Sequence, residues 1–189
     1  MKRQLLFIII TFLISGTAKS QRNVSFVEEY IDFEINQNHF SINGIYTFCN
    51  NGENEAKQNI LFPFAEKTAL IDSIRVTNLK SLEKVNFKKL ESAISFEFFI
   101  QPNDTIDINI FYRQKPGKIN KYIITTTKAW GKSLEKAVYT LTVPLDIKIE
   151  SFSYIPDSQE EINGKSLYLW EKFDFEPDID FEFVIKEWK

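Results

Sequence analysis

The chain has 189 residues, with 23 Lys and Arg against 26 Asp and Glu and a formal net charge of −3. This acidic balance argues against a nucleic-acid-binding protein, whose affinity comes largely from neutralising phosphates. The only cysteine, Cys49, cannot form an internal disulfide, which excludes a disulfide-stabilised secreted module and predicts a buried or half-buried thiol. We expect the 18 phenylalanines to supply the core instead.

The first twenty residues have the pattern of an export signal. Lys2 and Arg3 precede an apolar run from Leu5 to Ile14, and small residues follow at the positions that signal peptidase reads. The run is shorter than the roughly 20 residues of a membrane span, so we expect cleavage after residues 1–20; a retained anchor is the alternative. Cleavage removes three positive charges and no negative one, which leaves residues 21–189 as a single domain with a net charge of −6. We expect this domain in the periplasm, outside the cell or at the cell surface, with no transmembrane segment after cleavage.

Apolar and polar residues alternate through most of the remaining chain, and each such run predicts a strand with one buried face. Residues 27–35 and 40–48 flank an Asn-Gln-Asn turn and are expected to pair as an antiparallel hairpin. Residues 94–100 and 106–112 flank a Pro-Asn-Asp turn, and we expect the same pairing there.

Shorter or less regular runs complete the pattern. They lie at residues 60–64, 70–78, 85–87, 122–127, 137–143, 147–155 and 178–185. Short strands at regular spacing, with little helix, are typical of a sandwich or barrel. One-sided alternation in nearly every run favours an all-β, two-sheet antiparallel β-sandwich of about ten to twelve strands.

The last stretch, Ser166 to Lys189, is the densest in both aromatic and acidic residues, with seven of each. Ile179, Phe181 and Phe183 alternate with Asp180 and Glu182, as in a strand with one dry face. We therefore expect this stretch to form the strand pair that closes the core.

The acidic side of that stretch is also the first candidate for chemistry. Asp178, Asp180 and Glu182 share one face, and a solvated outer face is the ordinary interpretation of such a row. A calcium site is the alternative, because carboxylate oxygens are calcium ligands; three further residues that offer such oxygens are Asp157, Glu160 and Glu161. A carboxylate pair of a glycan-active enzyme is the other alternative.

Trp130 is the candidate for recognition. It sits in a break between strands, beside Gly131 and close to Lys132. An exposed tryptophan there would stack on a sugar or a protein partner, and a buried one would plug one end of the sandwich. We take Trp130 and Lys132 as candidate binding residues, whereas Trp170, which has apolar neighbours on both sides, is expected in the core.

Several short motifs resemble uncharacterised secreted domains of unknown function. The run from Tyr46 to Asn50 is followed by Phe62-Pro63 and by an Ile-x-Val strand, and a Trp-Gly loop then precedes the strand at residues 137–143. The stretch from Trp170 to Pro177 matches the last strand of those domains. The resemblance spans most of residues 21–189 and implies a β-sandwich; it carries no catalytic residues.

The front half is also similar to the β-rich N-terminal domain of gluzincin aminopeptidases. In those enzymes the zinc-binding His-Glu-x-x-His motif lies in a following helical domain, and this sequence has a single histidine, His39. The resemblance implies a β module without the zinc chemistry.

Together these features predict a non-enzymatic, exported binding or accessory module for an unknown protein or glycan partner, with no cofactor. The alternative is a carboxylate-dependent glycan-active enzyme or a calcium- or carbohydrate-binding domain. Two carboxyl groups about 5–10 Å apart in a concave pocket would favour the enzyme.

Overall fold

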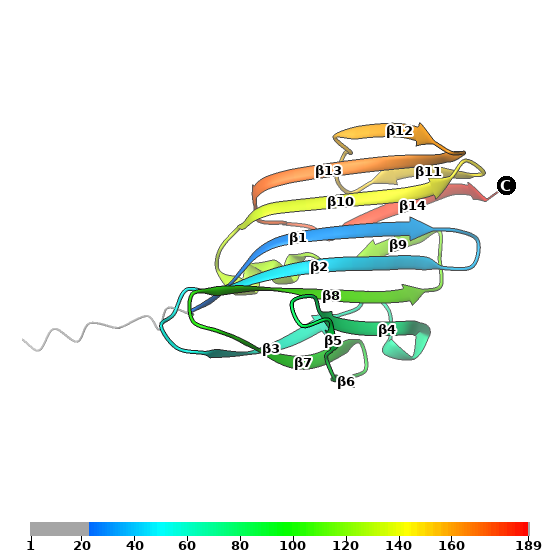
Figure 1. Cartoon of the computed structure of the whole chain (residues 1–189). Helices are drawn as coiled ribbons and strands as arrows, with labels where there is room; N and C mark the ends of the chain where they lie inside the picture. Colours follow the sequence, from blue (N-terminus) through cyan, green and yellow to red (C-terminus); the bar gives the residue numbers. More distant parts are fainter. Residues whose placement is uncertain (1–22, 189) are drawn as a thin grey trace, which may run out of the picture.

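The strands form where apolar and polar residues alternate, and they stack in two layers (Figure 1). The computed structural model describes residues 23–188, so the expected signal segment, residues 1–20, lies outside the described residues. Within the described residues, no helix is long and apolar enough to cross a membrane.

The front layer is one sheet of eight strands in the order β12–β13–β10–β1–β2–β8–β4–β5. Its strands are β1 (Val24–Ile35), β2 (Phe40–Asn50), β4 (Ile71–Asn78), β5 (Glu83–Lys84), β8 (Asp104–Gln114), β10 (Leu134–Pro144), β12 (Ser158–Ile162) and β13 (Lys165–Phe175). β1 and β10 run parallel, while the other described pairs of this sheet are antiparallel.

The back layer consists of two separate sheets of three strands each (Figure 1). One has the order β11–β14–β9, from β11 (Ile147–Phe152), β14 (Phe181–Trp188) and β9 (Ile119–Tyr122). The other has the order β3–β7–β6, from β3 (Ala56–Pro63), β7 (Ala93–Ile100) and β6 (Phe87–Lys89). Two 3-10 turns, η1 (Thr68–Leu70) and η2 (Thr125–Trp130), lie between strands.

Aromatic side chains join the two layers. Phe33 of β1 stacks on Phe181 of β14, with ring centroids 4.7 Å apart and planes 11° apart. On β2, Phe40 contacts the β14 sheet and Phe48, at 5.1 Å from Phe98, contacts the β7 sheet. Phe40 and Phe48 are an even number of residues apart and so lie on one face of β2. Both small sheets therefore pack against the same face of the large sheet.

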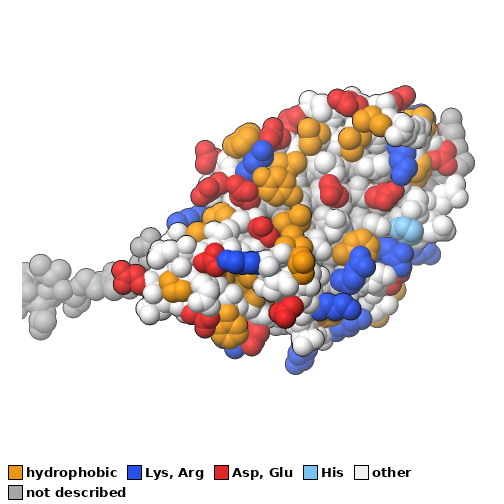
Figure 2. Space-filling view, viewed as in Figure 1, with side chains coloured by type: hydrophobic (Ala, Val, Ile, Leu, Met, Phe, Trp, Pro, Cys, Tyr) orange, Lys and Arg blue, Asp and Glu red, His pale blue; other side chains and the backbone are white. Residues whose placement is uncertain are grey.

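The opposite face of the large sheet is polar and charged, with apolar side chains scattered among the charges (Figure 2). Ion pairs link its strands, such as Lys165 with Glu34 at 2.9 Å and Lys136 with Glu171 at 2.7 Å. This face is the wet side of the alternation that the sequence predicts.

The structure confirms the all-β sandwich and the first hairpin, in which β1 pairs antiparallel with β2. Residues 23–188 contain fourteen strands, more than the ten to twelve expected, because short strands such as β5 and β6 leave little periodic signal in the sequence. Trp170 is buried in the core and Cys49 is half-buried, both as expected.

The second expected hairpin is wrong. β7 pairs with β3 and β6, while β8 pairs with β2 and β4, so the turn at Asn103 carries the chain from one layer to the other. Both strands have one apolar face, and these faces meet across the sandwich. Alternation alone does not distinguish strands that lie side by side from strands that lie face to face.

The C-terminal stretch also differs from the expected strand pair. β13 lies in the large sheet beside β10 and β12, whereas β14 lies between β11 and β9 in the back layer. Phe181, Phe183 and Ile185 are buried as expected, but Ile179, which precedes β14, is 48% exposed. The stretch thus contributes one strand to each layer and closes the core from both sides.

Truncation of Phe181 tests this placement. Phe181→Ala removes a fully buried ring that stacks on Phe33, and we expect it to lower the free energy of unfolding by about 3–5 kcal/mol. The matched control, Phe173→Ala on β13, removes a ring that is 63% exposed and should change that free energy by less than about 1 kcal/mol. Urea unfolding followed by circular dichroism measures both, and equal losses would contradict the layer assignment.

Candidate functional site

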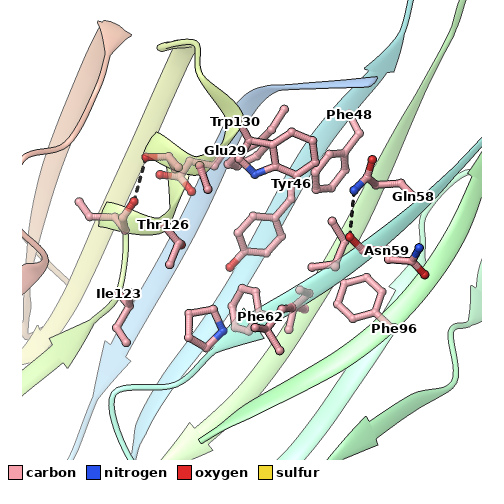
Figure 3. Close-up of a pocket in the computed structure, with 18 of the residues that line it drawn as sticks. Glu29, Tyr46, Phe48, Gln58, Asn59, Phe62, Phe96, Ile123, Thr126 and Trp130 are labelled. Carbon is pink, nitrogen blue, oxygen red and sulfur yellow. Dashed lines mark hydrogen bonds between the residues drawn. The ribbon is translucent and has the colours of Figure 1, made fainter. Parts of the chain in front are cut away.

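A cavity of about 520 Å³ opens in the back layer between the two small sheets (Figure 3). Its floor is the inner face of the large sheet, and its two walls come from β3 and from residues 122–130, which begin at the last residue of β9 and include η2. The described residues that line it are Phe26, Glu29, Tyr46, Phe48, Gln58, Asn59, Ile60, Leu61, Phe62, Pro63, Phe96, Ile110, Tyr122, Ile123, Ile124, Thr126, Thr127, Ala129 and Trp130.

Aromatic rings make up much of this lining. Phe26 stacks on Phe48 with centroids 5.1 Å apart, and the half-buried Trp130 lies 5.9 and 5.4 Å from these two rings. Tyr46 meets Phe62 of β3 edge-on at 5.5 Å. Rings placed in this way present apolar faces with few rotatable bonds to a bound group.

An irregularity in β1 brings a charged residue into this apolar lining. The register between β1 and β2 shifts between Phe26 and Glu28, which leaves Val27 without a partner of its own. A bulge of this kind changes which residues of a strand face inward. Phe26 before the bulge and Glu29 after it consequently both lie on the inner face.

Glu29 is 2% exposed, and the hydroxyl of the equally buried Tyr139 donates a hydrogen bond to its Oε1. Burial removes the water that would stabilise the carboxylate and raises the pKa of Glu29 to about 7; the hydrogen bond from Tyr139 offsets only part of this rise. Near neutral pH this carboxyl therefore exists as a mixture of its protonated and ionised forms.

A second buried polar pair lies between the floor and the β9 wall. The hydroxyls of Tyr46 and Tyr122 share a hydrogen bond of 2.6 Å, and burial raises the pKa of both phenols well above the ordinary range. The ring of Tyr46 lies over Gly44, where a Cβ would be 2.3 Å from the Tyr46 hydroxyl oxygen. Because Gly44 has no side chain, the Tyr46 ring can lie over it and reach Tyr122.

Of the two expected binding residues, the structure brings Trp130 to the cavity and not Lys132. Trp130 ends η2 and is half-buried against Phe26 and Phe48, so it is neither a free platform nor a completely buried plug. Lys132 follows in an exposed bend and is not among the lining residues.

The expected acidic trio occupies three different environments. Asp180 forms an ion pair with Lys121 at 2.8 Å and accepts hydrogen bonds from the backbone N–H and the hydroxyl of Thr125. Burial opposes its ionisation, but Lys121 and Thr125 outweigh burial and lower its pKa. Asp178 is exposed and accepts a hydrogen bond from Tyr154 at 3.3 Å, and Glu182 is half-buried on β14.

These contacts give Asp180 a structural role, since Thr125 begins η2 and η2 ends in Trp130. Of the alternative ligands, Asp157 pairs with Lys172 at 2.8 Å. Within residues 23–188, no three side chains of His, Cys, Asp or Glu converge as ligands for a metal ion.

The sequence interpretation missed Glu29, although a signal was present. Glu29 stands two residues before Ile31 and four before Phe33, on the apolar side of the expected strand. A carboxyl at a core position of an alternating strand is uncommon, and that exception marks the site. The partners of Glu29 come from distant strands and have no local signal.

Neither a protein-family model nor a curated protein sequence matches the chain. Solved structures do match its fold. A proposed nutrient-binding protein from Legionella pneumophila has a TM-score of 0.67 and 16% identity over 88% of this chain and 68% of that one. An M1 zinc metallopeptidase from Deinococcus radiodurans, in a mutant form bound to a Tyr-Ser-Ala substrate, has a TM-score of 0.55 and 10% identity.

The match to the metallopeptidase covers 87% of this chain and 43% of that one, so this chain spans less than half of that enzyme's length. It confirms the expected similarity to the N-terminal β domain of gluzincin aminopeptidases. At these identities the likeness concerns the fold.

The buried carboxyl predicts an unusual pH dependence of stability. Glu29 has a pKa of about 7 when folded, against an ordinary value of 4.5, so the folded state binds more protons between these values and stability falls as the pH rises through them. Above pH 7 the loss levels off at up to about 3 kcal/mol, since each pKa unit corresponds to about 1.4 kcal/mol.

Glu29→Gln keeps an acceptor for Tyr139 and cannot ionise. We expect this variant to be more stable than the parent at pH 8 and to match it near pH 4.5, as measured by urea unfolding across that range. Other groups titrate alike in both proteins, so the difference isolates Glu29. A difference that does not vary with pH would show that Glu29 keeps an ordinary pKa.

Proposed function

We propose that the chain is a non-enzymatic binding module, exported to the periplasm or the cell surface, that takes an apolar group of its ligand into the cavity between its two small sheets. The observation that carries this proposal is an aromatic-lined cavity of about 520 Å³ with a buried carboxyl, Glu29, in its wall. The apolar run and basic start of residues 1–20 support export.

The size and lining of the cavity support a binding role. Sites for small organic ligands have volumes of roughly 300–1,000 Å³, mainly apolar walls and a few polar groups that orient the ligand. Here the rings of Phe26, Phe48 and Trp130 supply the apolar surface, and Glu29 with the Tyr46–Tyr122 pair supplies the polar groups.

Glu29 determines which polar group of a ligand the cavity would accept. Tyr139 occupies Oε1, so Oε2 is the oxygen offered to a ligand. An ammonium or other N–H donor placed there would favour the ionised carboxylate, and the surrounding rings would add cation–π attraction. The preferred ligand therefore combines an apolar body with a nitrogen donor.

The comparison with known structures supports the same class of function. The Legionella protein, similar in fold over 88% of this chain, is described as a proposed nutrient-binding protein. For the alternative, a glycan-active enzyme, two carboxyl groups would act together on one bond. The described lining of the cavity contributes one, Glu29, which favours binding over that chemistry.

A pair of small probes tests the proposal. 2-Phenylethylamine carries a positive charge at both pH 6 and pH 8, and 2-phenylethanol is its neutral counterpart. Because Glu29 with a pKa of about 7 is mostly protonated at pH 6, the amine should bind about tenfold more tightly at pH 8. The alcohol should show no such change, and Glu29→Gln should abolish the dependence for the amine. Titrations followed by NMR chemical shifts measure all three.

Trp130→Ala tests the apolar wall in the same titrations. It removes a ring that contacts Phe26 and Phe48, and we expect it to weaken both probes at least about tenfold. Phe173→Ala, an exposed ring outside the cavity, is the control and should leave both affinities unchanged. Absence of binding by either probe, or equal binding by Trp130→Ala, would contradict the proposed site.

A further inference from the structure

One wall of the cavity is the edge of a strand. Six consecutive residues of β3, from Gln58 to Pro63, line the cavity. Successive side chains of a strand point to opposite faces, so side chains of one face alone cannot form such a wall. The strand must present its backbone edge. β3 is the terminal strand of its sheet, paired with β7 on one side and with no strand of residues 23–188 on the other.

The free edge has a defined set of backbone groups. The N–H and C=O of one strand residue point to the same edge, and successive residues alternate between the two edges. The side chain of Gln58 donates a hydrogen bond of 2.9 Å to the carbonyl of Asn59 (Figure 3), which places Asn59 on the free edge. By alternation Leu61 presents its groups there too, while Ile60 faces β7.

The facing wall also contains a run of consecutive residues. Tyr122, Ile123 and Ile124 are consecutive and all line the cavity. Tyr122 ends β9, the terminal strand of the other small sheet among the described residues, and Ile123 and Ile124 continue from it. Among the described residues, the terminal strands of the two small sheets, β9 and β3, therefore face a common gap, and the aromatic floor lies beneath it.

We propose that the ligand is an extended peptide segment that adds a strand to the free edge of β3 and places one apolar side chain in the cavity. This inference rests on the proposed function and names the class of its ligand. Main-chain hydrogen bonds to Asn59 and Leu61 supply affinity, and the cavity selects the inserted side chain, as in other cases of strand addition. The exposed side chain of Leu61, 65% accessible, extends the apolar contact beyond the cavity.

The combination of a free strand edge and an aromatic cavity favours a peptide as the ligand. A small organic molecule fills the cavity but gives the edge of β3 no neighbouring strand, whereas an extended chain both fills the cavity and pairs with the edge. The acidic balance of the chain favours a peptide with basic residues beside the inserted one.

Blocked peptides of the form acetyl-Lys-Thr-Thr-X-Thr-Thr-Lys-amide are the probes, with phenylalanine, tryptophan, leucine or valine at X. The variant Asn59→Pro removes the N–H of Asn59 from the free edge, and proline is tolerated at edge positions whose N–H has no ladder partner. Asn59→Thr is the matched control, because it loses the same side chain but keeps the N–H.

We expect at least one peptide to bind the parent and Asn59→Thr, and to bind Asn59→Pro at least about tenfold more weakly than Asn59→Thr. 2-Phenylethylamine, which occupies only the cavity, should bind the two variants alike. A peptide that is N-methylated at alternate residues on the edge facing β3 should lose binding to the parent.

Three results would overturn the inference. One is equal peptide binding by Asn59→Pro and Asn59→Thr. Another is binding of 2-phenylethylamine without binding of any peptide, which would leave the small-ligand proposal standing and refute strand addition. The third is a dimer of this chain, seen by sedimentation, that forms with Asn59→Thr but not with Asn59→Pro and that excludes the peptides, since the edge would then pair with a second copy.

Discussion

The widths of the two layers do not match, and this mismatch shapes the molecule. Neighbouring strands lie about 4.8 Å apart, so eight strands span about 34 Å while a sheet of three spans about 10 Å. The long sheet needs its apolar face covered, and two short sheets with a gap between them cover it. Over most of the face, rings such as Phe33 and Phe181 fill the space between layers. Over the gap, the floor of the large sheet faces a cavity whose walls are the edges of both small sheets.

The bulge in β1 gives this gap its chemical character. A strand without it would continue one alternation from Phe26 onward, and Glu29 would then face away from the core together with Ile31 and Phe33. Instead the shift after Phe26 places Glu29 among rings, where its ionised form is disfavoured. A group that lowers stability at neutral pH and lies in the wall of a cavity is a candidate for function. Tyr139 and the bulge hold it in place, and Asp180 anchors the turn that brings Trp130 over the same cavity.

The sequence predicts the architecture well where the information is local. Alternation predicts the β1–β2 hairpin and the burial of Phe181 and Phe183, and the apolar surroundings of Trp170 predict its place in the core. Pairing between distant strands is not local. The turn at Asn103 joins strands of two different layers, β7 and β8, and not two neighbouring strands. The sequence does not show this, because face-to-face and side-by-side strands have the same alternation of apolar and polar residues. The site depends on such pairings, because Glu29, Tyr139 and Trp130 are far apart in the chain. Its local signals are the break in the pattern at Trp130 and the carboxyl of Glu29 at a core position.

Titration of Glu29 shows whether this residue is a buried carboxyl in a ligand site. The carboxyl carbons of ¹³C-labelled glutamate report each ionisation by NMR, and the spectrum of Glu29→Gln identifies the resonance of Glu29. We expect a midpoint near pH 7 in the free protein and a lower midpoint when 2-phenylethylamine saturates the cavity, because the ammonium favours the carboxylate. A midpoint near the ordinary value of 4.5, or one that the amine leaves unchanged, would contradict this expectation.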